Sequence, residues 1–244
     1  DLELVKQNAL SFLTAAGADR SDPVVATALS KLNTKATTLL STVNPDGSWS
    51  DINYTQIPGD SWPLGKHYDR ILSMAKAYST PGQLLFGDAS LKLAIERALA
   101  YGFKYIYPGV NKLGNWWWWR IGVPRKLAPT LLLLQGHIGS SVFNDELATL
   151  AYLIGPAPGS SESQNTIWTT MNHLYYALLI NDPLWMRDKV VATMASAVVI
   201  TTTAGIKSDY SFHHHGPQLY TGGYGGEYAE DVAEYVLFTR GTSY

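Results

Sequence analysis

Residues 163–204 decide the fold class, and they read SQNTIWTTMNHLYYALLINDPLWMRDKVVATMASAVVITTTA. Apolar side chains recur at helical spacing over 165–181. The Asp-Pro pair at 182–183 is a helix start, because proline at the first helical position has no N–H group to leave unpaired. A second helix is therefore expected over 183–204, including its β-branched final residues. The stretch predicts two consecutive helices joined by a tight turn.

The same helical spacing recurs along the rest of the chain, where few segments alternate at period two. Polar, aromatic-rich loops separate pairs of helices, as in α-solenoids and α/α toroids. Long loops on one rim of such a scaffold are the expected place for a site. Further helices are expected over 2–16, 23–43, 66–79, 88–106, 122–137, 143–154 and 227–239, and the loops over 44–62, 107–120, 155–164 and 205–226.

Composition excludes several classes of protein. The 244 residues are 46% hydrophobic and carry a net charge of −2, which argues against disorder and against a polycation that coats nucleic acid. No apolar run is long enough to span a membrane. The absence of Cys excludes disulfides, thiolate metal sites and a Cys nucleophile. The 8 Trp and 15 Tyr offer flat faces suited to stacking on sugars or bases.

Residues 115–120 read Asn-Trp-Trp-Trp-Trp-Arg and precede an apolar helix. Four successive Trp cannot all point into one core from a helix or a strand, so at least one or two must line a surface or a cleft. Packing in the core or at an interface is the alternative. Because the chain is not basic, we favour a platform for sugar rings over one for nucleobases.

Residues 209–225 place three His and three Tyr in a glycine-rich loop. Three adjacent His point in different directions and no acidic residue follows at ligand spacing, so no metal site is expected. A His and a Tyr acting as acid–base partners fit better, because their ordinary pKa values of about 6.5 and about 10 bracket neutral pH. Aromatic side chains that only pack are the alternative.

Residues 163–168, taken alone, are best explained as a helix start with Asn165 or Ser163 as the N-cap. His67, His137 and His173 lie in or next to predicted helices and are expected to be structural. The chain has no GxSxG motif, no Walker-type phosphate loop and no GxGxxG after a strand.

These segments together resemble polysaccharide lyase family 8, the hyaluronate, chondroitin AC and xanthan lyases. Residues 67–78 look like the family's scaffold helix, and the resemblance covers essentially the whole chain. Asn165 lies in a segment similar to the one that holds the family's catalytic Asn. The family's Asn-Trp-Trp patch, Ile-Gly-x-Pro turn and His-x4-Tyr-Thr-Gly-x-Tyr-Gly segment are matched in order by Asn115-Trp116-Trp117, Ile121-Gly122-Val123-Pro124, and His215 through Tyr220-Thr221-Gly222 to Tyr224-Gly225.

The resemblance implies an all-α fold, an incomplete (α/α) toroid of helical hairpins with long aromatic loops lining a cleft. It implies β-elimination at a uronic acid, giving a 4,5-unsaturated product without a metal or organic cofactor. Asn165 would donate to the carboxylate, and His215 would help to neutralise it or share in taking the C5 proton. Tyr224 would be the base and then the acid. Substrate contacts are expected from Asn115, Trp116, Trp117, Arg120 and Tyr220.

Arg120 departs from the family, which usually has an acidic or amide residue there. The expected partner is an acidic polysaccharide, and neither a nucleic-acid partner nor a membrane span is expected. Residues 215–219 favour chondroitin or hyaluronan over xanthan by their likeness to chondroitin AC lyases. The protein is expected to be secreted or periplasmic after removal of a signal peptide.

The resemblance also implies that 1–244 is a single toroid domain, truncated at its C-terminal end and without the family's β-sandwich domains. The family's catalytic Arg and Glu follow the Tyr at positions that lie beyond residue 244, so the remaining part of the same enzyme is an expected partner. Two other functions use the same aromatic loops. One is a non-catalytic carbohydrate-binding module or disabled lyase fragment, and the other is an α-solenoid that binds a protein.

Overall fold

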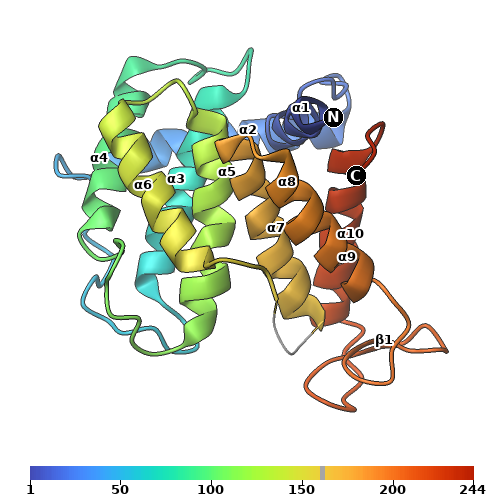
Figure 1. The fold of residues 1–244 in the computed structure, drawn as a ribbon. Coiled ribbons are helices and arrows are strands. Elements are labelled where there is room, and N and C mark those ends of the chain that lie inside the picture. The colour runs from blue at the N-terminus through green and yellow to red at the C-terminus, as the bar shows by residue number, and fades with distance from the viewer. Residues whose placement is uncertain (160–162) are drawn as a thin grey trace. The chain divides into compact units, whose positions relative to one another are not determined.

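The computed structural model describes residues 1–159 and 163–244, and it is mostly helical, as the sequence predicts (Figure 1). A two-stranded antiparallel sheet pairs Gly205 with His213 and Ile206 with Phe212. The elements are α1 (Leu2–Leu13), α2 (Pro23–Thr42), α3 (Pro63–Ser79), α4 (Ala89–Phe103), the π-helical turn η1 (Trp118–Gly122), α5 (Pro124–Leu134), α6 (Ser140–Ile154), α7 (Ser163–Ile180), α8 (Pro183–Trp185), the π-helical turn η2 (Met186–Val191), α9 (Ala192–Ala197), β1 (Gly205–Ile206), β2 (Phe212–His213) and α10 (Tyr224–Thr239).

Aspartate caps set several of these helix starts. The Asp22 carboxylate accepts hydrogen bonds from the backbone N–H groups of Val24 and Val25, with Pro23 at the first helical position. Asp182 caps α8 in the same way. Each cap satisfies N–H groups that have no partner inside the helix, so the Asp-Pro signal read from the sequence is confirmed at both places.

The helix predicted over 183–204 ends early, at Ala197. The residues after it leave the helix, and Ile200 forms a bridge with Ile206, whose carbonyl accepts a hydrogen bond of 2.8 Å from the Thr201 N–H. β-Branched side chains lose χ1 freedom in a helix and pack well in extended chain. At Ile200, the bridge to Ile206 therefore takes the place of continued helix.

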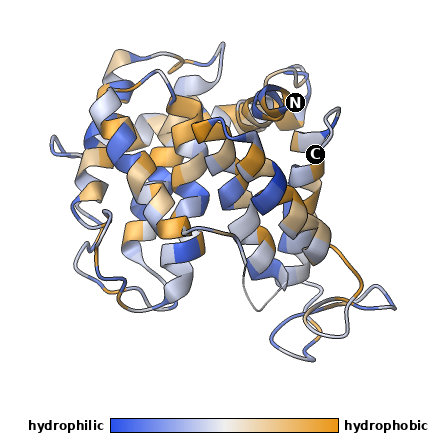
Figure 2. Cartoon of the chain, viewed as in Figure 1, coloured by the Kyte–Doolittle hydropathy of each residue, from blue (hydrophilic) through white to orange (hydrophobic). Residues whose placement is uncertain are grey.

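Contacts divide the chain into two compact units, residues 10–153 and residues 1–9 with 154–244. In the first unit, α3 packs against α2, α4 and α5, and its buried face includes Ile71 and Met74. Figure 2 shows hydrophobic segments along the helices of both units, with hydrophilic residues interspersed. The prediction of a single domain over 1–244 stays a prediction.

In the second unit, α7 packs against η2, α9 and α10. Almost every described side chain of α7 is buried, including His173, which is stacked on Trp185 at 5.6 Å and accepts the indole N–H at 3.2 Å through Nδ1. A helix buried on all sides is the centre of its unit. Within the described parts of the chain, no helix is both long and apolar enough to cross a bilayer.

Candidate functional site

Tyr224 lies inside a group of aromatic side chains in the unit that contains α7 and α10. Its ring is stacked on His214, with centroids 3.8 Å apart and planes 22° apart. His215 and Tyr220 meet the same ring edge-on at 5.2 Å and 5.0 Å, and Trp168 lies 5.6 Å away. We call these five residues the Tyr224 cage. The cage brings Tyr224, His215 and Tyr220 together, as their spacing in the sequence suggested.

Backbone hydrogen bonds and glycines hold the loop in this conformation. The Tyr220 N–H donates to the Phe212 carbonyl at 2.8 Å, and the Tyr220 carbonyl accepts the Gly225 N–H at 3.0 Å. A Cβ at Gly225 would lie 3.0 Å from that carbonyl and 3.1 Å from Phe212. Gly223, which precedes α10, has φ 58°, a region that other residues rarely adopt. The glycines therefore permit the close approach that places Tyr224 against the histidines.

The neighbouring histidines have opposite environments. His214 is fully buried, whereas His215 is exposed and has φ 54°. A non-glycine residue in the left-handed region costs of order 1–2 kcal/mol and is enriched at functional sites. His215 is therefore open to solvent and to a ligand beside Tyr224, while the buried His214 supports the Tyr224 ring.

Asn165 is the third residue of α7, inside the helix, so its interpretation as the N-cap is wrong. The side chain is 5% exposed, and its Oδ1 has no hydrogen-bond partner within the described structure. Trp168 lies one turn further along the same helix face and contacts Tyr224. Asn165 thus lies on the face of α7 that carries the cage, with an amide whose hydrogen-bonding capacity the fold leaves incomplete.

Two hydrogen bonds, one buried and one partly buried, join α7 to α10. The Gln164 side chain donates through Nε2 to Asp231 Oδ2 at 2.8 Å, and Tyr175 donates to Glu234 Oε1 at 3.0 Å. Gln164 adjoins Asn165, and Asp231 lies on the helix that begins at Tyr224. These bonds fix the helix that carries Asn165 against the helix that carries Tyr224.

The Trp run lies in the unit of residues 10–153, and its four indoles differ in exposure. Trp116 is 51% exposed, Trp117 and Trp118 are half-buried, and Trp119 is 5% exposed. Trp117 and Trp118 meet edge-on at 5.1 Å, and Trp119 donates its indole N–H to the Leu113 carbonyl at 2.7 Å. The prediction that at least one Trp lines a surface is confirmed, and Trp119 fulfils the packing alternative.

Asn115 organises the start of this run. Its Oδ1 accepts the backbone N–H of Trp117 at 3.0 Å, and its Nδ2 donates to the Gly59 carbonyl at 3.2 Å. Gly122 lies beneath the indoles, since a Cβ there would be 2.6 Å from ring atoms of both Trp117 and Trp118. Asn115 therefore positions the indoles of Trp116 and Trp117, which we call the Trp platform. The predicted contact of Asn115 with substrate stays a prediction.

Two cations lie beside the platform, Arg120 and Lys112. Burial lowers the pKa of both groups, and the positive charge of Arg120 lowers that of Lys112 further. The Lys112 ammonium lies 4.0 Å from the centre of the Tyr152 ring and donates to the Tyr152 carbonyl at 3.0 Å. This concentration of positive charge in a nearly neutral chain suits an anionic ligand on an aromatic surface.

Sequence reasoning missed His214, Trp168, Gln164 and Asp231, and it did not single out Lys112. The buried His214 is hidden in the sequence by its two histidine neighbours. Trp168 had a usable signal, because it follows Asn165 at helical spacing. No group of three or more His, Cys, Asp or Glu residues in the described segments is arranged to hold a metal ion.

The chain thus combines an aromatic platform with adjacent cations and a Tyr–His–Asn cluster on a helical scaffold. Residues 9–244 match the family model described as polysaccharide lyase family 8, N-terminal alpha-helical domain. The chain therefore belongs to polysaccharide lyase family 8.

Individual relatives agree with this membership, and solved structures share the fold. Chondroitinase-AC from Pedobacter heparinus is 27% identical, in an alignment that covers 84% of this chain and 29% of that protein. A hyaluronate lyase from Thermasporomyces composti is 24% identical, in an alignment that covers 100% of this chain and 31% of that protein. This chain thus spans under a third of those relatives. The chondroitin AC lyase from Streptomyces coelicolor A3, in complex with chondroitin sulphate, has a TM-score of 0.86 at 22% identity, covering 99% of this chain and 33% of that one. A Paenibacillus xanthan lyase structure has a TM-score of 0.83 at 21% identity, and the alignment covers 99% of this chain and 23% of that one.

Proposed function

We propose that this chain forms the helical part of a lyase that cleaves a uronic-acid-containing glycosaminoglycan, chondroitin or hyaluronan, by β-elimination. The observation that carries the proposal is the Tyr224 cage, in which a phenol is stacked on one imidazole and meets a second edge-on. The relatives named chondroitinase-AC and hyaluronate lyase support this substrate class.

The chemistry begins at the substrate carboxylate. The C5 proton of a uronate is weakly acidic, because its removal adds charge next to an existing negative group. Hydrogen bonds to that carboxylate lower the barrier by stabilising the developing charge. Asn165 can donate through its amide from a buried position, and the exposed His215 can add a donor or a positive charge.

Tyr224 then acts twice. Its phenolate takes the C5 proton, the C5–H electron pair forms the C4=C5 double bond, and the bond from C4 to the glycosidic oxygen breaks. The new phenol returns its proton to the leaving oxygen, which restores the phenolate and leaves a 4,5-unsaturated uronate. A Tyr with its ordinary pKa is only about 0.1% ionised at pH 7, so the mechanism requires positive charge near the ring. His215 supplies part of it in this proposal, and the family's Arg, C-terminal to the Tyr, would supply the rest.

The Trp platform binds sugar rings in this proposal. Trp116 and Trp117 offer indole faces, and Arg120 offers a cation to an acidic sugar. Asn115 orients the indoles, and Tyr220 contacts substrate from within the Tyr224 cage. A polymeric substrate also favours export to the periplasm or the medium.

A second function, carbohydrate binding without turnover, is favoured by one observation. The exposed indole of Trp116 stacks on a sugar without any help from Tyr224. In that case the platform retains oligosaccharides and the cage contributes no chemistry.

One experiment separates the two functions. The 244-residue chain is incubated with hyaluronan, chondroitin sulfate and xanthan, and the ultraviolet absorbance of the unsaturated product is followed. Tyr224→Phe should lower the rate by about 10²–10⁴-fold, because it removes a general base. Tyr210→Phe is the matched control, since Tyr210 is 82% exposed and lies outside the cage. An unchanged rate in Tyr224→Phe refutes the proposed base, and retention of polysaccharide without product favours the second function.

A further inference from the structure

A cavity of about 790 Å³ lies beside the hairpin that carries the histidines. It belongs entirely to the unit that contains α7 and α10. Its polar lining comes from Thr201, Thr202, Thr203, Lys207, Ser208 and His213, and Ile200, Ala204 and Pro217 add apolar surface. This size is typical of a site that encloses a small organic ligand. None of these residues has a role in the proposed elimination.

The register of the hairpin explains why the cavity and the Tyr224 cage lie on opposite faces. Successive side chains of a strand point to opposite faces. Phe212 and His214 share one face, where their rings are stacked at 6.4 Å and His214 stacks on Tyr224. His213 points the other way, into the cavity. Gly205 pairs with His213, and Lys207, the first residue after β1, also lines the cavity.

The chemistry of the lining selects a ligand. Lys207 is the one formal cation among the lining residues, and none of them is a carboxylate. The Lys207 ammonium now donates to the Thr203 carbonyl, a contact that an incoming anion can share because an ammonium has three donors. The nearest acidic residue in sequence, Asp209, accepts from the N–H and hydroxyl of Ser211 and adds negative charge near His213. The hydroxyls match sugar hydroxyls, and the apolar residues match the face of a sugar ring.

The geometry points to a second saccharide site. We propose that this cavity binds an acidic sugar residue of a polysaccharide, with Lys207 contacting its carboxylate or sulfate and the threonine hydroxyls contacting its ring. The site is separate from the Tyr224 cage, yet both are built on the same short hairpin. The inference rests on the proposed function only in taking an acidic polysaccharide as the ligand.

The test measures binding without turnover. The 244-residue chain carrying Tyr224→Phe is titrated calorimetrically with three tetrasaccharides: chondroitin 4-sulfate, hyaluronan and a neutral chitin fragment. Lys207→Gln should weaken binding of an acidic tetrasaccharide about tenfold, the effect of losing one charge-assisted hydrogen bond. Lys189→Gln is the matched control, a lysine of the same unit outside the cavity lining. Thr202→Ala gives a second variant on an exposed residue that should not disturb folding.

The outcomes separate cleanly. A loss for both acidic ligands assigns the carboxylate to Lys207, and a loss for the sulfated ligand alone assigns the sulfate. Equal binding by Lys207→Gln and the parent, or an equal loss for the neutral fragment, overturns the proposal. Absence of binding by the parent to both acidic tetrasaccharides overturns it too. The rate of unsaturated-product formation by the chain with Tyr224 intact bears on the proposed elimination alone and leaves this binding result standing.

Discussion

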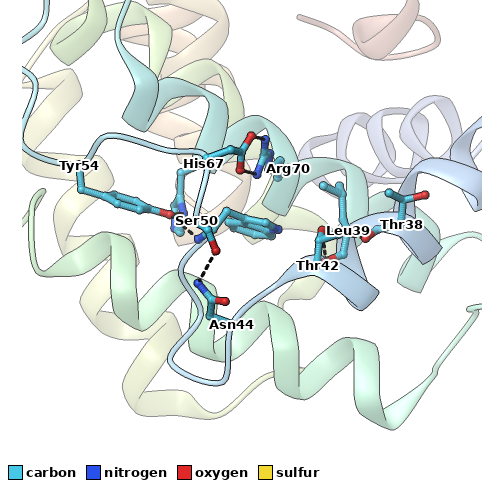
Figure 3. Close-up of polar contacts among 10 residues, drawn as sticks. Thr38, Leu39, Thr42, Asn44, Ser50, Tyr54, His67 and Arg70 are labelled. Carbon is cyan, nitrogen blue, oxygen red and sulfur yellow. Dashed lines mark hydrogen bonds and ion pairs between the residues drawn. The ribbon is translucent and has the colours of Figure 1, made fainter.

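His67 offers a test in which the sign and the size of the effect both follow from the structure. Its Nε2 lies 2.8 Å from the Ala98 carbonyl, which can only accept, so Nε2 carries the proton. Nδ1 then accepts the Tyr54 O–H at 3.1 Å (Figure 3), and the Tyr54 oxygen accepts the backbone N–H of Trp49 at 2.9 Å. The imidazole is fully buried in its neutral form.

Protonation of His67 is disfavoured in the folded state. Burial, the main cause, lowers the pKa of His67 from its ordinary 6.5 to about 4, with a smaller contribution from the Arg70 charge. The Ala98 hydrogen bond opposes part of this shift. At about 1.4 kcal/mol per pKa unit, the neutral imidazole contributes about 3 kcal/mol to stability. That contribution is complete above pH 6.5, is lost as the pH falls from 6.5 to about 4, and changes no further below that.

His67→Gln removes the titration and keeps an N–H that can reach the Ala98 carbonyl. The variant should be less stable than the parent at pH 7, and the gap should narrow by about 3 kcal/mol between pH 6.5 and pH 4. Urea unfolding followed by Trp fluorescence measures the gap, because Trp49 lies edge-on to His67 at 5.1 Å. His137→Gln, at an exposed histidine, is the matched control for the substitution itself. A gap that stays constant from pH 7 to pH 4 refutes the reasoning.

Two further predictions concern stability. Burial raises the pKa of Glu146 well above its ordinary value, and neither carboxyl oxygen has a hydrogen-bond partner in the described structure. Folding therefore favours the protonated form of Glu146. This preference contributes stability that is complete below pH 4.5 and is lost as the pH rises. Glu146→Gln should raise the urea midpoint at pH 7 but not at pH 4. Gly47→Ala should lower the melting temperature more than Gly17→Ala. Both glycines have positive φ, worth about 1–2 kcal/mol of strain, but only at Gly47 would the new Cβ lie 2.2 Å from the Arg97 carbonyl oxygen. Equal melting temperatures for the two glycine variants would contradict the steric part of the argument.

Local signals in the sequence predicted most helices well. Asp22 and Asp182 act through neighbouring N–H groups, so their effect is visible in a short window. The failure over 198–203 has the opposite cause. The bridge at Ile200 depends on pairing with Ile206, and helical periodicity does not report which distant residue will offer such a partner.

The sequence identified the residues of the candidate site, but not the residues that hold them in place. Asn165, His215 and Tyr224 are recognisable from residue type, order and family resemblance. The role of His214 depends on which residues of β1 and β2 pair with each other. Because strand side chains alternate between two faces, that pairing decides which histidine faces inward. A shift of one residue would exchange the environments of His213 and His214. The pairing of β1 with β2 in the folded chain is what fixes these environments.

The π-helical turn η1 has a consequence for how the aromatic platform can change over time. A π-turn holds one residue more than an α-helical turn, and here it follows Trp116 and Trp117 and leads directly into α5. Deleting a single residue from 118–122 would let the helix run on in α form and rotate everything before it by about 100° around the axis. The indoles would then face a different direction while α5 kept its buried side. The direction in which the indoles point thus depends on the number of residues in η1. Inserting or deleting one residue there would change this direction more than any substitution.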